Sequence, residues 1–211
     1  MTTQLVWLRN DLRLADHPAL IAAAARGPVA MLHVLDDETP GAWKMGAAQR
    51  WWLHHSLASL SADIAARGGR LILRRGRAGP IVRAVAAELR ADVHALMRHE
   101  PWAAVQDEEA GPITLHHGIT LAPPASVLSG TGGRYRIFTP WWRKLQDQMP
   151  PPRPAGVPDL RWADVAPIAS DDLAAWGLLP KAPDWSGGFA AWQPGEAGAA
   201  ARLADFARRV A

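Results

Sequence analysis

Charged side chains follow directly on a short apolar run close to the N-terminus. The run Leu5–Leu8 contains no polar residue, which is the pattern of a strand buried on both faces. Alternating charges come next, at Arg9, Asp11, Arg13 and Asp16. Pro18 then begins an alanine-rich helix, with Asp16 placed near its N-cap, where a carboxylate can accept from free amides. Because open α/β sheets bind ligands where their strands end, these charges either belong to a polar site or pair with each other and fix the loop.

Two later apolar runs also end in polar residues. Val29–Leu35 is followed by three acids at 36–38, which could hold ribose hydroxyls, a cation or the polar edge of a ligand, or could form a solvated turn. The run that starts at residue 92 ends in Arg98, His99 and Glu100. In a parallel sheet the carboxyl ends of neighbouring strands meet at one edge, so these groups are expected to border one crevice.

The elements that must position these groups follow from the hydrophobic pattern. Apolar runs predict strands over residues 5–8, 29–35, 70–76, 92–100 and 113–121. Helical patterns separate them at 18–26, 46–67 and 80–90, and residues 101–112 leave room for about two further helical turns. This alternation predicts a Rossmann-like, doubly wound five-stranded parallel sheet of order 3-2-1-4-5. Its switch point lies between the first and fourth strands.

Composition limits the classes of function. The chain of 211 residues has no cysteine, which excludes disulfides and thiolate metal sites. It has no run of eighteen apolar residues, so we expect a cytoplasmic protein that does not associate with membranes. The net charge of +3 is too small for the dense basic surface of an autonomous nucleic-acid binder, and strong DNA binding is not expected.

Three segments carry a resemblance to a known family. They are V-W-L-R-N-D-L-R-L-A-D-H-P-A-L near the N-terminus, A-A-Q-R-W-W-L-H-H-S-L from residue 47, and G-T-G-G-R-Y-R-I-F-T-P-W-W-R-K-L from residue 130. Together they resemble the DNA photolyase/cryptochrome family. The resemblance extends over nearly all of the chain but covers only the first half of a family member. The segment W-Q-P-G-E from residue 192 is similar to the point where photolyases enter their helical flavin domain.

The resemblance implies a function and a domain organisation. It implies the photoantenna-chromophore-binding half of a deoxyribodipyrimidine photo-lyase, a flavoprotein that repairs DNA with light. Residues 1–148 would form the α/β antenna domain, 149–195 a proline-rich linker, and 196–211 the first helix leading toward the FAD domain. The composition of residues 149–169 predicts an extended segment that is poor in core-forming side chains. The FAD domain itself is not in the sequence, so the chain alone is predicted to be inactive and to hold FAD only if that domain is supplied.

The expected chromophore site is the crevice at the strand ends. Its predicted binding residues are Leu8, Arg9, Leu35, Asp36, Asp37, Arg50, Leu53, Arg98 and Glu100. The leucines would line a flat apolar slot and the arginines would hold a polyhydroxyl or phosphate tail. Folate-binding relatives carry an Asn-Glu pair where this chain has Trp102 and Ala103. A flavin or deazaflavin is therefore favoured over methenyl-folate, and the alternative is an empty crevice closed by internal salt bridges.

Two other functions remain open at this point. The chain could be part of a cryptochrome-like photoreceptor, or a stand-alone α/β module that binds a nucleotide or a protein. In either case, Leu203, Phe206 and Val210 form an apolar stripe on the last helix. A stripe without a partner tends to self-associate, which predicts a weak homodimer.

Overall fold

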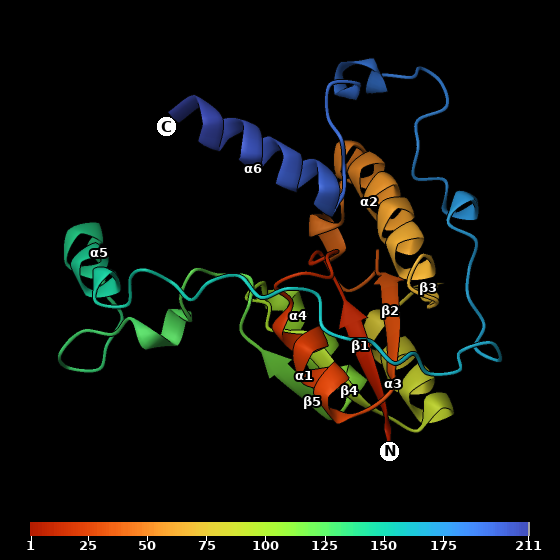
Figure 1. Cartoon of the computed structure of the whole chain (residues 1–211), viewed down its shortest axis with the longest axis horizontal. Coiled ribbons are helices and arrows are strands. Elements are labelled where there is room, and N and C mark those ends of the chain that lie inside the picture. Colours follow the sequence, from red (N-terminus) through yellow and green to blue (C-terminus); the bar gives the residue numbers. More distant parts are fainter. Residues whose placement is uncertain (211) are drawn as a thin grey trace.

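The computed structural model describes residues 1–210, and its centre is a five-stranded parallel sheet (Figure 1). The strands are β1 (Thr3–Leu8), β2 (Val29–Leu35), β3 (Leu71–Arg75), β4 (Ala91–Leu96) and β5 (Ile113–His116). They are ordered β3-β2-β1-β4-β5, and every neighbouring pair is parallel. This confirms the predicted doubly wound sheet. β4 and β5 are shorter than predicted, because the chain leaves the sheet after Leu96 and His116 and the residues that follow lie in loops or in α4.

Helices cover both faces of the sheet. The chain forms α1 (Pro18–Arg26) and α2 (Ala47–Ala65) over one face, and α3 (Ala78–Leu89) and α4 (Pro101–Ala110) over the other. Side chains of β1 alternate between the two cores, so Val6 and Leu8 pack toward α1 and α2 while Leu5 and Trp7 pack toward α3. All four are at most 1% exposed. The sheet is thus buried on both sides, as a parallel sheet requires.

The N-cap of α1 differs from the prediction. His17, not Asp16, caps the helix, and its ring accepts from the amide of Leu20 at 3.1 Å. Asp16 has φ +50° and turns its backbone toward Ala155, which it binds through both backbone and carboxylate at 2.8 and 3.1 Å. Asp16 therefore ties the first loop to the proline-rich segment.

The proline-rich segment after residue 148 is extended and lies along the domain (Figure 1). It adds a bridge to Val29 through Trp162, and Val165, Ile168, Trp176 and Leu178 are buried in the two cores. The expectation that residues 149–169 are poor in core-forming side chains does not hold at Val165 and Ile168. The reason is that single apolar residues spaced along extended chain leave no periodic signal in the sequence.

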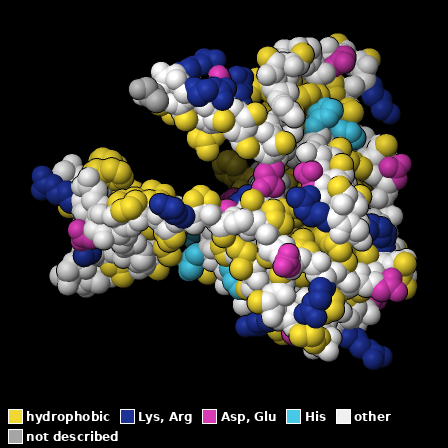
Figure 2. Space-filling model, in the orientation of Figure 1, with side chains coloured by type: hydrophobic (Ala, Val, Ile, Leu, Met, Phe, Trp, Pro, Cys, Tyr) yellow, Lys and Arg dark blue, Asp and Glu magenta, His cyan; other side chains and the backbone are white. Residues whose placement is uncertain are grey.

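Two helices extend away from the sheet. α5 (Phe138–Gln146) stands at the end of an arm, and α6 (Glu196–Val210) extends beyond the end of α2 (Figure 1). Figure 2 shows hydrophobic side chains gathered on both projections. Short 3₁₀ turns lie at Gly41–Trp43, Pro124–Ser126, Ala174–Trp176 and Ser186–Phe189. The last residue of the predicted 196–211 helix lies outside the described residues. Within residues 1–210, no helix is long and apolar enough to cross a membrane.

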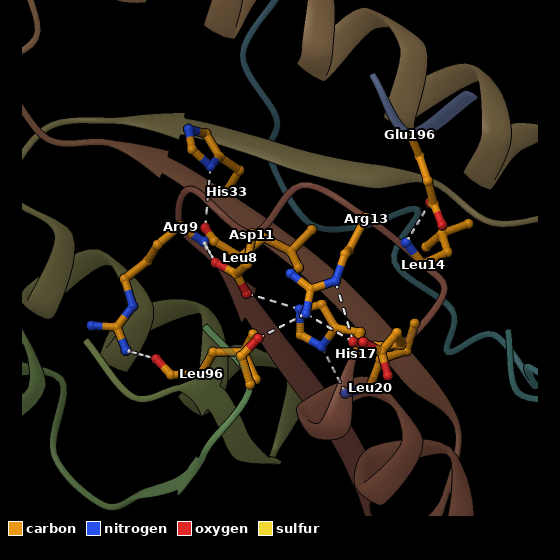
Figure 3. Close-up of polar contacts among 12 residues, drawn as sticks. Leu8, Arg9, Asp11, Arg13, Leu14, His17, Leu20, His33, Leu96 and Glu196 are labelled. Atoms are coloured by element: carbon orange, nitrogen blue, oxygen red, sulfur yellow. Dashed lines mark hydrogen bonds and ion pairs between the residues drawn. The ribbon is translucent and has the colours of Figure 1, made fainter. Parts of the chain in front are cut away.

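Glu196 fastens the start of α6 to the loop that follows β1. Its carboxylate accepts from the amides of Leu14 and Ala15 at 2.8 and 3.0 Å (Figure 3). The predicted apolar stripe on this helix is open to solvent, with Leu203 68% and Phe206 61% exposed. The first turn of α6 is therefore anchored through Glu196, and most of the side chains in the rest of the helix are exposed to solvent.

Candidate functional site

A cavity of about 490 Å³ lies where β1, β2 and β4 end. This is the edge at which the sequence predicts a crevice, next to the switch point between β1 and β4. Of the predicted site residues, five line it: Arg9, Leu35, Asp36, Arg98 and Glu100. The remaining walls come from the loop 36–46, the first two turns of α4 and the beginning of α3.

Arg9 is held inside the protein by its own partners. Its Nη1 donates to the carboxylate of Asp107 at 2.8 Å. Its Nη2 donates to the carbonyl of Leu96 at 2.6 Å (Figure 3). The guanidinium lies 4.5 Å from the ring centre of Trp7. Burial lowers the pKa of Arg9 and raises the pKa of Asp107, and the ion pair partly offsets both effects. Arg9 thus contributes a buried wall rather than a free cation.

Asp11 organises the loop beneath Arg9. One carboxylate oxygen accepts from the amide of Arg9 at 2.9 Å, and the other lies 2.8 Å from Nε2 of His17 (Figure 3). Since Nδ1 of His17 accepts from Leu20, the proton is on Nε2 and donates to Asp11. Burial acts to raise the pKa of Asp11, but the bonds from His17 and Arg9 lower it overall. For Asp11, the structure thus agrees with the second of the two expectations for this loop. Its carboxylate is bound by groups of the loop itself and fixes the loop conformation. The role of His17 was missed, although its place before Pro18 marks a cap.

Asp36 is a hydrogen-bonding centre of the cavity wall. Its carboxylate accepts from the amides of Glu38, Thr39 and Ala78, from the hydroxyl of Thr39 and from Nε2 of Gln106, at 2.6–3.0 Å. Burial acts to raise the pKa of Asp36, but these bonds lower it. With five donors on two oxygens, Asp36 fixes the loop and two helices and has little capacity left for a ligand.

Four predicted residues do not line this cavity. Asp37 pairs with Arg50 and, at 3.3 Å, with Arg75, beside the cavity rather than in it. Leu8 is fully buried in the core under α1 and α2. Leu53 packs in the same core and borders a second cavity, of about 630 Å³, between α2 and α6. The prediction placed these four residues by their positions at strand ends and on a helix face. In the structure their side chains point into the core or into an ion pair beside the cavity.

Arg98 and Glu100 form an ion pair on the cavity rim. Nε of Arg98 donates to the carboxylate at 3.0 Å and Nη2 makes a second, shorter contact. The hydrogen bond from Arg98 lowers the pKa of Glu100 to about 2, although burial opposes it. Arg98 is therefore neutralised by its own neighbour two residues away.

Several lining residues were not predicted from the sequence. Trp7 and Trp43 bring indole rings to the cavity, and Lys44 and His33 add polar groups. Trp102, which the sequence already places at this site, adds a third indole ring. No periodic pattern marks these residues, since they come from separate strands and loops. An abundance of tryptophan was the one available signal, with 11 in the chain.

Three polar atoms of lining residues are buried and have no partner in the described chain. They are Nε1 of Trp7, Nε of Arg9 and Nε2 of His33. Burial lowers the pKa of His33 to about 4, so its ring is neutral at pH 7. Its Nδ1 lies 3.1 Å from the carbonyl of Leu8 and must carry the proton, which leaves Nε2 as an acceptor. Buried polar atoms rarely lack partners, and a planar ligand with a polar edge would suit this aromatic cavity. Within residues 1–210 no cluster of three potential ligands could hold a metal ion.

Comparison with known proteins identifies the family. The family model described as DNA photolyase matches residues 4–159. A deoxyribodipyrimidine photo-lyase of Agrobacterium fabrum is 38% identical over 213 residues, which cover 96% of this chain and 44% of that protein. The solved class III photolyase of Agrobacterium tumefaciens superposes with a TM-score of 0.84 at 37% identity, over 98% of this chain and 45% of its own.

A more distant structure shares the fold. An archaeal photolyase of Sulfolobus tokodaii, solved with two FAD molecules, matches with a TM-score of 0.65 at 16% identity over 82% of this chain and 40% of its own. The chain thus spans less than half the length of these relatives. The matches favour the photolyase hypothesis over a cryptochrome-like receptor and over a stand-alone module. The chain belongs to the DNA photolyase family and corresponds to the N-terminal half of a photolyase.

Proposed function

We propose that this chain is the light-collecting half of an enzyme that repairs pyrimidine dimers in DNA. The cavity at the ends of β1, β2 and β4 would bind a planar antenna chromophore. When bound, the chromophore would absorb light and pass the excitation to a flavin held by the other half of the enzyme. The observation that carries the proposal is the cavity of about 490 Å³ with three unpartnered buried polar atoms among its lining residues. This volume lies within the range of about 300–1,000 Å³ that is typical of small-molecule sites.

The residues of the cavity would divide the work of binding. Trp102, which is partly exposed, offers apolar surface for a ring system, and the buried side chains of Trp7 and Leu35 belong to the packed wall. The carboxylate of Asp36 would keep the loop 36–46 in place, and the Arg9–Asp107 ion pair would keep the floor rigid. A rigid wall limits the motion of the chromophore relative to the rest of the enzyme, as excitation transfer requires.

Among the known antenna classes we favour a flavin or deazaflavin over methenyl-folate. The basis is the presence of Trp102 and Ala103 where folate-binding relatives have an amide and a carboxylate. Trp102 lines the cavity without filling it, and Ala103 is only 2% exposed. Ala103 has no polar side-chain atom and Trp102 has only an indole N–H donor, so neither can accept a hydrogen bond from the polar edge of a pteridine ring as the Asn-Glu pair would.

The partner of this half would be a helical FAD domain. Residues 1–148 would act as the antenna domain, 149–195 as the linker and 196–211 as the lead into that domain. The exposed apolar side chains of the arm, including Ile137, Phe138 and Trp142, together with the stripe on α6, offer surfaces for it. FAD and damaged DNA would then be bound by the partner rather than by this chain.

Purified chain would test the proposal most directly. Absorbance and mass spectrometry would show whether a chromophore is carried, and titration with riboflavin, FMN, a deazaflavin and methenyl-folate would rank affinities by fluorescence polarisation. Failure of all four to bind at micromolar concentrations would refute the antenna role. Tighter binding of methenyl-folate than of every flavin would refute the ligand assignment but leave the antenna role intact.

The division of labour gives a second test. This chain alone should neither bind FAD stoichiometrically at a catalytic site nor restore a dimer-containing oligonucleotide under near-ultraviolet or blue light. Restoration of the oligonucleotide by this polypeptide without a second chain would contradict the proposed division.

A further inference from the structure

Trp43 lines the mouth of the cavity, and most of its surface is exposed to solvent. Its side chain is 77% exposed, the highest fraction of any tryptophan among the exposed hydrophobic residues. The other exposed tryptophans, such as Trp52, Trp142 and Trp192, pack against other aromatic rings, whereas Trp43 has no ring partner in residues 1–210. An indole exposed in this way leaves a large apolar face available for stacking.

The loop that carries Trp43 is anchored at its base and free at its tip. Asp36 fixes the start through the amides of Glu38 and Thr39. Arg50 fixes the end by donating to the carbonyl of Met45 at 3.1 Å. The tip, Gly41–Trp43, is a single 3₁₀ turn whose backbone bonds stay within the loop. Trp43 is thus presented at the cavity by a defined turn rather than by packing against the domain.

Lys44 is the one charged lining side chain that has no partner in the described chain. Arg9 is bound by Asp107, Arg98 is bound by Glu100, and Asp36 accepts five hydrogen bonds. The ammonium of Lys44 makes neither an ion pair nor a hydrogen bond within residues 1–210 and lies next to Trp43 on the same turn. An anionic group that reaches this cavity meets a free cation at Lys44, whereas at either arginine it must displace a carboxylate.

We propose that Trp43 stacks on the ring of the chromophore at the mouth of the cavity and that Lys44 binds the anionic group on its tail. This inference rests on the antenna function proposed above and assigns the ligand class as a planar heteroaromatic ring with an anionic tail. It replaces the arginines, which the sequence favours as the tail-binding groups, by a residue of the loop. Trp43 and Lys44 are specificity-determining residues, because Trp43 selects for the planar ring and Lys44 selects for the negative charge of the tail.

The test compares ligands that differ only in charge. Riboflavin and FMN share a ring and differ by a phosphate, so their affinities separate stacking from charge recognition. Trp43→Ala should weaken both by about tenfold, and Trp43→Phe by about threefold or less. Lys44→Gln should weaken FMN by about three- to fivefold, more at low salt than at high salt, and leave riboflavin unchanged. Trp142→Ala on the arm and Lys181→Gln in the extended segment serve as matched exposed controls and should change neither ligand.

Distinct outcomes separate this inference from the proposed function. If the wild-type chain binds none of the flavins, both the antenna function and this inference are refuted. If the wild-type chain binds flavins but Trp43→Ala and Lys44→Gln bind them equally well, the antenna function stands and the inference is overturned. The inference is also overturned if Arg98→Gln, rather than Lys44→Gln, removes the preference for FMN. Circular dichroism of each variant shows that the exposed substitutions leave the fold intact.

Discussion

Replacing Asp36 by Asn tests whether the wall of the cavity depends on one carboxylate. In the wild type, one oxygen accepts from the amides of Glu38 and Thr39, both at 2.9 Å. The other accepts from the hydroxyl of Thr39 at 2.6 Å, the amide of Ala78 at 3.0 Å and Nε2 of Gln106 at 2.8 Å. Asn has one accepting oxygen, and its NH₂ group cannot accept. At least two donors therefore lose their acceptor in either orientation of the amide.

The expected loss follows from this count. Each donor left without its acceptor costs about 1–1.5 kcal/mol, so Asp36→Asn should lower the free energy of unfolding by about 2–3 kcal/mol. For a chain of this size the melting temperature should fall by roughly 4–12 °C. Urea titrations followed by circular dichroism measure the change. Glu38→Gln is the matched control, since Glu38 is exposed and its side chain makes no hydrogen bond within residues 1–210. It should stay within about 0.5 kcal/mol of wild type.

The pH dependence provides an internal check. Because the hydrogen bonds lower the folded pKa of Asp36, its stabilisation is complete above the unfolded value of about 3.9 and is lost as the pH falls through the folded value. The difference between wild type and Asp36→Asn should therefore be constant from pH 7 to 5 and shrink below about pH 4. An unfolding midpoint of Asp36→Asn equal to that of Glu38→Gln at pH 7 would refute the assignment of Asp36 as the centre of the wall.

Three further predictions concern the histidines and α6. Burial lowers the pKa of His33 and His94 to about 4, below the unfolded value of about 6.5, so unfolding takes up protons between these values. The free energy of unfolding, measured in urea, should fall as the pH decreases from about 6.5 toward 4, and a flat profile over this range would contradict the burial of both rings. Glu196→Ala removes the acceptor of two amides in the loop after β1, and hydrogen exchange of those amides should accelerate about tenfold; unchanged protection would argue against the anchor. The exposed stripe of α6 should give a concentration-dependent dimer in sedimentation that Phe206→Glu abolishes, whereas a strict monomer would remove the case for self-association.

The sequence by itself determined the sheet and the place of the crevice. Short runs such as Leu5–Leu8 and Val29–Leu35 are apolar on both faces, and only a parallel sheet covered by helices buries both faces of a strand. The strand order 3-2-1-4-5 and its switch point are those of a doubly wound sheet, which the alternation of strands and helices indicates. Five predicted residues line the cavity because the carboxyl ends of parallel strands meet at one edge.

The tertiary structure alone decided which polar groups are free. Arg9 meets Asp107 from 98 positions away, and Asp36 meets Gln106 from 70 positions away, so no local spacing announces either pair. The direction in which a side chain points could not be predicted either. A strand-end position does not indicate whether a side chain such as that of Leu8 points toward the cavity or into the core. Composition and periodicity report burial along one element, whereas the partner of a buried charge depends on contacts between elements distant in the chain. For this reason the sequence located the edge of the sheet, and only the fold separated the neutralised arginines from the exposed Trp43 and Lys44.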